Sequence, residues 1–145
     1  MNTPLQIVNI LLVEDNPGDV RLTEEAFKLA KNANKLYIAK DGIEALAFLN
    51  HEGTFINVPR PDLILLDLNL PRMDGRELLA RIKKDKELRT IPVIILSTSE
   101  ADTDILSCYN FHANCYIKKP MDFDKFSEIV HHIEYFWLSI VRLPN

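Results

Sequence analysis

The sequence predicts an α/β domain of five β-strand–α-helix units arranged around a parallel sheet. Four short apolar runs have the length and the aliphatic, often β-branched, content of buried strands. They are residues 10–13, 63–66, 93–96 and 115–117. Segments with helical periodicity separate these runs, and strands that alternate with helices along a chain form a parallel sheet. Since parallel strands all point the same way, the polar residues that follow the runs should gather at one edge of the sheet.

The size and composition of the chain fit one ordinary globular domain. Its 145 residues provide one hydrophobic core but not comfortably two, and 47% of them are hydrophobic and 26% charged. The formal net charge of −4 argues against nucleic acid as the main partner, because phosphate backbones attract basic surfaces. Neither a signal peptide nor an apolar stretch long enough to span a bilayer is visible, so we expect a cytoplasmic protein without a membrane partner.

The cysteines and histidines give little indication of a metal site. We interpret Cys108 and Cys115 as small core residues rather than as a disulfide or a metal-binding pair, because unpaired cysteines are commonly buried. His131 and His132 are adjacent on a predicted helix and therefore point to different faces. Solvated or half-buried imidazoles are the simpler interpretation, since the spacing of zinc ligands is absent.

The first two units have clear boundaries. After the first strand, Asn16 is suited to cap a helix that begins at Pro17, where a missing N–H costs nothing. Residues 35–40 predict the second strand, and residues 41–42, Asp-Gly, lead into the second helix. That helix contains Ile43, Leu46, Ala47 and Leu49.

The later helices differ in how clearly they are patterned. A polar loop, the longest of the chain, leads to the third strand, and the third helix starts near Gly75. Its inward face is expected to carry Leu78, Leu79 and Ile82, and the charged residues 83–86 are expected to be solvated. A weakly patterned helix is predicted over residues 102–110, and a strongly amphipathic one from about residue 122.

Acidic residues follow the first and third strands. Glu14 and Asp15 end the first apolar run, and Asp67 ends the run of the third strand. If these strands are neighbours, three carboxylates crowd together at the carboxyl edge, where open α/β sheets bind their ligands. The carboxylates would raise one another's pKa values unless a cation neutralised them. Oxygen ligands that stay partly open to water suit Mg²⁺, which shares its coordination sphere with phosphate.

A hydroxyl and an ammonium group complete this set. Ser97 ends the run of the fourth strand, and Lys119 follows the last strand. An ionised Asp67 can act as a nucleophile on phosphorus, while Ser97 and Lys119 contact the phosphoryl oxygens as charge develops. Each residue alone has a simpler explanation, as a turn residue, a cap or a solvated side chain. Together, complementary groups at the ends of successive strands favour phosphoryl chemistry.

Four segments resemble the receiver domain of two-component response regulators. They are Leu12-Val13-Glu14-Asp15, residues 65–71 with Asp74-Gly75 following, residues 92–98, and Tyr116-Ile117-Lys118-Lys119-Pro120. The segments run through nearly the whole chain. The resemblance implies a flavodoxin-like, doubly wound fold with strand order 2-1-3-4-5. It also implies one receiver domain over residues 1–145, with an extended last helix and no output domain.

By this resemblance, Asp67 is the phosphoacceptor and takes part in binding Mg²⁺. Asp15 would bind the metal directly, Glu14 largely through water, and Asn69 through its backbone carbonyl. Glu14 stands where many members of the family have aspartate, and this substitution preserves the chemistry.

The resemblance also assigns roles at the last two strands. Ser97 would be the switch hydroxyl and Tyr116 the switch aromatic residue. Lys119, rather than Lys118, matches the phosphate-binding lysine because it directly precedes Pro120, and the bond between them would be cis. On phosphorylation, Ser97 would move towards the phosphoryl group and Tyr116 would turn inward, which couples the site to the surface of the last two helices and the last strand.

Finer details resemble the small response regulators that serve cyanobacterial phytochromes. The matching segments are residues 19–22, 59–61, 74–77, 113–116 and the ending from Phe136-Trp137 onwards. This resemblance implies that the phosphodonor is a phosphohistidine on a light-sensing histidine kinase.

The apolar residues of the predicted last helix indicate a homodimer. Its apolar residues recur at spacings of three and four: Phe123, Phe126, Val130, Ile133, Trp137 and Ile140. Packing on the sheet explains the first part of this series, whereas the apolar excess around Phe136, Trp137 and Leu143 either folds back on the domain or meets a partner. We expect dimerisation through the fifth strand and helix, because aromatic anchors are typical of interfaces.

Other function classes fit the sequence less well. A flavodoxin needs a glycine- and hydroxyl-rich loop after its first strand, whereas residues 14–17 would repel phosphate without a metal. A phosphatase with an aspartate nucleophile needs a second acid two residues later, where this chain has Asn69. The remaining alternative is a receiver-like interaction module that phosphorylation does not control. The expected catalysis is limited to the protein's own phosphotransfer and autodephosphorylation.

Overall fold

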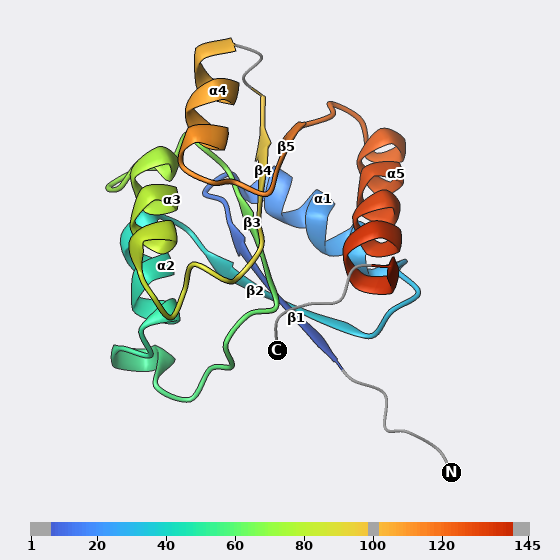
Figure 1. Ribbon diagram of the computed structural model, residues 1–145. Coiled ribbons are helices and arrows are strands. Elements are labelled where there is room, and N and C mark those ends of the chain that lie inside the picture. The colour runs from blue at the N-terminus through green and yellow to red at the C-terminus, as the bar shows by residue number, and fades with distance from the viewer. Residues whose placement is uncertain (1–6, 99–101, 141–145) are drawn as a thin grey trace.

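The five strands form one parallel sheet with helices on both faces (Figure 1). The computed structural model describes residues 7–98 and 102–140, and among these it describes all side chains except those of residues 102–103 and 138–140. The strand order is β2-β1-β3-β4-β5, so the predicted α/β fold and its strand order are confirmed. The strands are β1 (Val8–Val13), β2 (Asn34–Ala39), β3 (Leu63–Leu66), β4 (Val93–Ser97) and β5 (Cys115–Lys118).

The helices alternate with the strands along the chain. Helices α1 and α5 cover one face of the sheet, and α2, α3 and α4 cover the other (Figure 1). The last helix continues into a π-helical segment, and a short 3-10 helix lies in the long loop after α2. The bounds are α1 (Pro17–Lys28), α2 (Gly42–Leu49), the 3-10 helix (Gly53–Phe55), α3 (Gly75–Lys84), α4 (Asp102–Asn110), α5 (Phe123–Ile133) and the π-helical segment (Glu134–Ile140).

Two apolar layers enclose the sheet. On one side, residues such as Phe27 of α1 and Phe126 and Val130 of α5 pack against the sheet, and on the other Leu78 and Ile82 of α3 do so. Strands β1, β3 and β4 are covered on both faces, which explains why they appear in the sequence as unbroken apolar runs. Among the described residues, no helix is long and apolar enough to cross a lipid bilayer.

Side-chain caps fix where the helices begin. Each of four helices is preceded by a residue whose side-chain oxygen accepts a hydrogen bond from a backbone N–H in the first turn, and this satisfies one of the donors left free at a helix start. The expected starts of the first, second, third and fifth helices are thereby confirmed. The pairs are Asn16 with Asp19, Asp41 with Glu44, Asp74 with Arg76, and Asp122 with Lys125.

One expected strand boundary and one expected solvated side chain need correction. The second strand begins and ends one residue earlier than expected. Lys83 is half-buried rather than fully solvated, and its Nζ donates hydrogen bonds to the carbonyls of Arg89 (3.0 Å) and Ile91 (2.9 Å) and to Oδ1 of Asn114 (3.2 Å). Burial lowers the pKa of Lys83 to about 8. This lysine ties the end of α3 to the starts of β4 and β5.

The two cysteines are free thiols, as expected. Cys108 is buried and Cys115 is half-buried. Burial raises the pKa of both thiols, which keeps them protonated and unreactive.

Candidate functional site

Three carboxylates meet at the carboxyl ends of β1 and β3. Val13 pairs with Leu66 in the parallel ladder, so Glu14 and Asp67 occupy the next positions of neighbouring strands. Carboxylate oxygens of Glu14, Asp15 and Asp67 all lie within 4.8 Å of one another. Glu14 and Asp67 are buried, with 3% and 9% exposure, whereas Asp15 is exposed. The predicted convergence of these three acids is confirmed.

Lys119 reaches into the same cluster from the end of β5. Its ammonium group is hydrogen-bonded to Oε1 of Glu14 and lies 3.0 Å from Oδ2 of Asp19 and 3.6 Å from Oδ2 of Asp67. The side chain is buried, with 5% of the residue exposed. A single buried cation therefore faces several acids.

The pKa values of Glu14 and Lys119 are both raised, for different reasons. Burial raises the pKa of Glu14 from its usual 4.5 to about 7; the hydrogen bond from Lys119 opposes this change and the charge of Asp67 adds to it. Burial alone would lower the pKa of Lys119, but the hydrogen bonds to Glu14 and Asp19 and the nearby negative charges outweigh it, so the pKa is raised. A bound cation would hold Glu14 ionised at neutral pH.

The raised pKa of Glu14 gives an expected pH dependence of stability. The folded state holds this proton more tightly than the unfolded state, so the contribution of Glu14 is complete below about pH 4.5 and is lost as the pH rises through about 7. Without metal, the free energy of unfolding should fall by up to about 3 kcal/mol over this range relative to a Glu14→Gln variant. Denaturant unfolding with a chelator present measures this difference, and parallel pH profiles of the two proteins would contradict it.

The predicted switch residues lie on β4, the neighbour of β3, and on β5, the edge strand beyond it. Ser97 ends β4 and is fully buried, and its carbonyl accepts a hydrogen bond from the backbone N–H of Lys119 at 2.7 Å. Tyr116 is half-buried in the edge strand β5, and its backbone N–H donates to the hydroxyl of Tyr109 in α4 at 3.1 Å. Asn69 is exposed two residues after Asp67. The bond between Ser97 and Lys119 thus joins the two strand ends beside the acids.

The start of α3 packs directly against the strand end that carries Asp67. The N–H of Gly75 donates to the carbonyl of Leu68 at 2.9 Å. A Cβ atom at Gly75 would lie only 2.3 Å from the carbonyl oxygen of Asp67 and 2.7 Å from Cα of Leu68. Only glycine permits this approach, and the approach fixes the backbone of Asp67.

Sequence reasoning missed Asp19 as a site residue. Its carboxylate binds the ammonium of Lys119, although an acid in the first turn of a helix is normally explained by the helix dipole alone. The available signal was its position one turn after Asp15, in the helix that starts at the same sheet edge.

The expected cis bond before Pro120 is wrong. No cis peptide bond occurs in the described residues, so Lys119 and Pro120 are joined by a trans bond. A trans bond before proline is favoured by about 0.5–1 kcal/mol, and it already allows the Lys119 ammonium to reach Glu14 and Asp67.

The donor set suits a hard divalent cation. All three acidic side chains offer oxygen, and two of them are buried where a double positive charge would offset their mutual repulsion. One face of the cluster stays open at Asp15, which leaves room for water or a phosphoryl oxygen.

Comparison with known proteins identifies the family. The profile of the response regulator receiver domain matches residues 10–131. The chain belongs to the response regulator receiver family. The receiver fold, the acidic cluster and the lysine at the carboxyl edge are therefore found together in a member of a two-component signalling family.

Relatives from cyanobacteria are similar to this receiver over nearly their whole length. Response regulator Rcp1 of Synechocystis sp. is 47% identical over 135 residues, which cover 93% of this chain and 92% of Rcp1. The phosphorylated cyanobacterial phytochrome response regulator RcpA superposes with a TM-score of 0.92 at 48% identity, covering 97% of this chain and all of RcpA.

A metal-bound structure of Rcp1 is also similar to the structure of this chain. The Mn²⁺-bound form of Rcp1 has a TM-score of 0.89 at 46% identity and covers 95% of this chain and 99% of Rcp1. The receiver described here is thus related to phytochrome response regulators, and its acidic cluster is of the kind that binds a divalent metal.

Proposed function

We propose that this protein is a phosphorylation-controlled switch that accepts a phosphoryl group on Asp67 from a histidine kinase. The observation that carries the proposal is the convergence of three carboxylates and the Lys119 ammonium at the carboxyl edge of the sheet. Capping or solvation does not account for a buried lysine facing two buried acids, whereas phosphoryl transfer uses each of them.

The side chains divide the work of the transfer. An oxygen of the Asp67 carboxylate forms a bond to phosphorus, the bond from phosphorus to the histidine nitrogen of the donor breaks, and the imidazole keeps the electron pair. The Lys119 ammonium, 3.6 Å from Asp67, is close enough to meet a phosphoryl oxygen as negative charge develops there. The Ser97 hydroxyl then contacts another of these oxygens.

We assign the metal site to the same edge. Asp15, Glu14 and Asp67 would hold Mg²⁺, with the backbone carbonyl of Asn69 as a further oxygen ligand. When bound, the metal neutralises the charge of the phosphoryl oxygens. Glu14, whose hydrogen bond with Lys119 occupies one oxygen, would take part through its other oxygen or through water.

The readout would pass through Ser97 and Tyr116. A phosphoryl group adds negative charge and strong acceptor oxygens, to which Ser97 would move. Tyr116 lies on the next strand and is connected to α4 through the hydroxyl of Tyr109. A change at Ser97 would thereby alter the surface formed by α4, β5 and α5, and partners would distinguish the two states there.

The likeness to Rcp1 and RcpA supports a phytochrome-type, light-sensing histidine kinase as the donor. Such a kinase would present its phosphohistidine to the open side of the site, where Asp15 is exposed. We place this exchange in the cytoplasm.

The test is the intact mass of the protein after incubation with acetyl phosphate, with Mg²⁺ or with a chelator. Gain of one phosphoryl group that depends on Mg²⁺ is the expected result. A folded protein that gains none would overturn the proposal and favour an interaction module that phosphorylation does not control.

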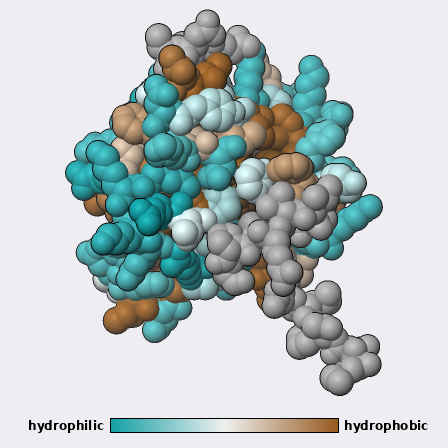
Figure 2. All heavy atoms as spheres, viewed as in Figure 1, coloured by the Kyte–Doolittle hydropathy of each residue, from teal (hydrophilic) through white to brown (hydrophobic). Residues whose placement is uncertain are grey.

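We further propose a homodimer through β5 and α5. An apolar groove of about 390 Å³ lies between them, lined by residues that include Cys115, Ile117, Ile129, Ile133, Phe136 and Trp137. Hydrophilic side chains cover α2 and α3, whereas apolar side chains are exposed between β5 and α5 (Figure 2). Phe136 is 51% exposed and packs edge-to-face on Trp137, with 5.4 Å between the ring centroids. Exposed aromatic side chains of this kind are typical anchors of protein interfaces. Ile140 and Leu143, expected to add to this surface, lie outside the described side chains.

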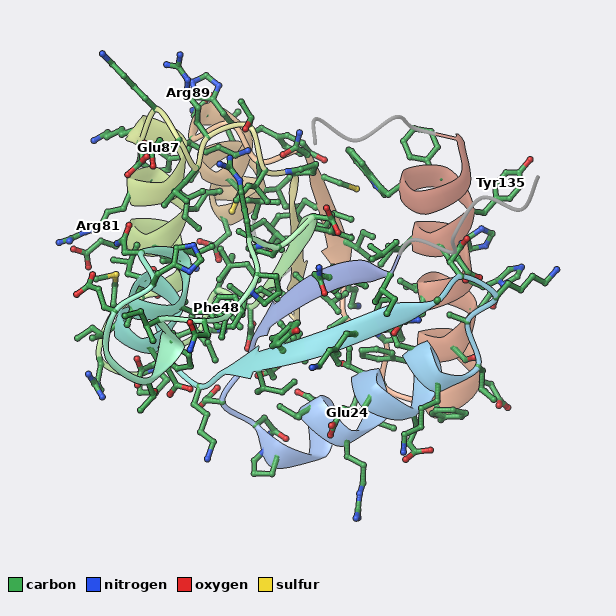
Figure 3. All side chains as sticks on the ribbon, turned by 90° about the horizontal axis from the view of Figure 1, so that it is seen from below. Glu24, Phe48, Arg81, Glu87, Arg89 and Tyr135 are labelled. Carbon is green, nitrogen blue, oxygen red and sulfur yellow. The ribbon has the colours of Figure 1, made fainter. Side chains whose placement is uncertain are left out.

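Replacing Phe136 with glutamine is expected to give a folded monomer in sedimentation velocity experiments. Tyr135→Gln is the matched control, because Tyr135 is 63% exposed and points away from the domain (Figure 3), so its loss should leave the dimer intact. A Phe136→Gln protein that sediments as the same dimer as wild type would contradict this interface.

A further inference from the structure

Asp19 binds the lysine of the site from a different element. Its Oδ2 lies 3.0 Å from Nζ of Lys119, a separation of 100 residues along the chain. The backbone of Asp19 is fixed on both sides: its N–H donates to Oδ1 of Asn16 at 3.0 Å, and its carbonyl accepts from the hydroxyl of Thr23 at 2.8 Å. The carboxylate is therefore held in place by the first turn of α1.

The ammonium of Lys119 is unequally shared among three acids. It is hydrogen-bonded to Glu14 and Asp19, whereas its distance of 3.6 Å from Asp67 is too long for a hydrogen bond. Asp19 thus holds the Lys119 ammonium beside Asp67, the predicted nucleophile, while the ammonium makes no hydrogen bond to Asp67.

We propose that Asp19 is a positioning residue for phosphoryl transfer, which holds the Lys119 ammonium off the Asp67 carboxylate and in line for a phosphoryl oxygen. This inference rests on the proposed phosphorylation of Asp67. Without the acceptor at Asp19, one N–H of the ammonium loses its partner. The buried Asp67 carboxylate, 3.6 Å away, is the acid of the cluster that has no hydrogen bond from Lys119 and can accept one from that N–H.

A lysine bound to Asp67 would hinder the reaction. With acetyl phosphate, a carboxylate oxygen of Asp67 forms the new bond to phosphorus, the bond from phosphorus to the acetate oxygen breaks, and acetate leaves with the electron pair. A hydrogen bond from Lys119 to Asp67 ties up an oxygen of the nucleophile and has to break before the attack. Asp19 gives the ammonium a partner that it can keep throughout the transfer, since a second N–H of the same group can meet the phosphoryl oxygen.

A helix-terminal role alone does not explain this contact. An acid in the first turn of α1 stabilises the helix by about 0.3–1 kcal/mol through the dipole, with no partner needed elsewhere. Here the carboxylate also binds a buried ammonium that belongs to the loop after β5. The two roles can be separated, because the helix dipole acts on charge and the positioning acts through the acceptor oxygen.

The test compares Asp19→Asn with Asp19→Ala. Both variants lose the same charge, but only asparagine keeps an oxygen in place to accept from Lys119. We expect the maximal rate of phosphorylation by acetyl phosphate, followed by intact mass with Mg²⁺, to be about tenfold lower in Asp19→Ala than in Asp19→Asn. The donor concentration at half-maximal rate should be similar in the two variants. Glu24→Ala, which removes an exposed charge from the same helix (Figure 3), should match wild type.

The outcomes separate this inference from the proposed function. Equal maximal rates for Asp19→Ala and Asp19→Asn, in a series in which wild type is phosphorylated, would overturn the positioning role alone. A wild type that gains no phosphoryl group would overturn both. A crystal structure of Asp19→Ala gives an answer that does not depend on the reaction: Nζ of Lys119 is expected within hydrogen-bonding distance of Asp67, and an unmoved ammonium would contradict the inference.

Discussion

An Asp67→Asn variant is expected to gain no phosphoryl group under conditions in which wild type gains one. The amide has nearly the shape of the carboxylate, so the buried position at the end of β3 is preserved, but it lacks the charged oxygen that attacks phosphorus. Intact mass after incubation with acetyl phosphate and Mg²⁺ measures the gain. Asp124→Asn, an exposed acid on α5, serves as a control and should be modified like wild type.

The same variant should be more stable than wild type when no metal is present. Asp67 is one of three carboxylates within 4.8 Å, and its charge contributes to the raised pKa of Glu14. Removing that charge relieves the repulsion from Glu14 and Asp15 and also loses the attraction to the Lys119 ammonium 3.6 Å away. Because Lys119 keeps its hydrogen bonds to Glu14 and Asp19, we expect the relief to outweigh the loss, by about 1–2 kcal/mol. Denaturant unfolding with a chelator tests this, and Mg²⁺ should narrow the difference in stability between the two proteins because it stabilises wild type more.

Modification of Asp67→Asn at the wild-type rate would contradict the assignment of Asp67 and show that another residue accepts the phosphoryl group.

The strands and the core of the site could be predicted because burial and direction constrain them strongly. Strands β1, β3 and β4 are covered on both faces, which leaves an apolar run in the sequence that ends where the strand ends. In a parallel sheet those ends share one edge, so the sequence positions of Glu14, Asp67 and Lys119 were enough to bring them together. No comparable rule predicts distances within the cluster.

The features that sequence reasoning missed depend on contacts between distant elements. Helix α2 has only eight residues and is apolar on most sides, so periodicity does not show that Phe48 is buried while Ile43 is 43% exposed. Lys83 belongs to a charged run, and its burial depends on the carbonyls that precede β4. The role of Asp19 was missed for the same reason, because its partner, Lys119, is 100 residues away along the chain.

Replacing Gly75 with alanine is expected to destabilise the fold by about 3 kcal/mol. The added Cβ would lie 2.3 Å from the carbonyl oxygen of Asp67 and 2.7 Å from Cα of Leu68. Both atoms belong to the backbone at the buried end of β3, so no flexible side chain can move aside. Either the first turn of α3 or the backbone of Asp67 must shift.

Gly18→Ala is the matched control, since Gly18 also lies in the first turn of a helix that follows a strand. There the nearest atom to an added Cβ is the side-chain Oδ1 of Asn16, at 3.2 Å, which can adjust, so we expect a change within about 0.5 kcal/mol. Denaturant unfolding compares the two variants, and equal stabilities would show that the close approach at Gly75 carries no energetic weight.

The rate of phosphorylation of Gly75→Ala then shows which element gives way. If α3 shifts, the Asp67 carboxylate keeps its distances to Glu14 and Lys119, and the variant is less stable but reacts at the wild-type rate. If the backbone of Asp67 shifts, the carboxylate moves with it and the rate should fall by up to about 100-fold, the cost of a displacement of about 1 Å at a reacting group. We expect the second result, because the shorter of the two contacts is to Asp67 itself.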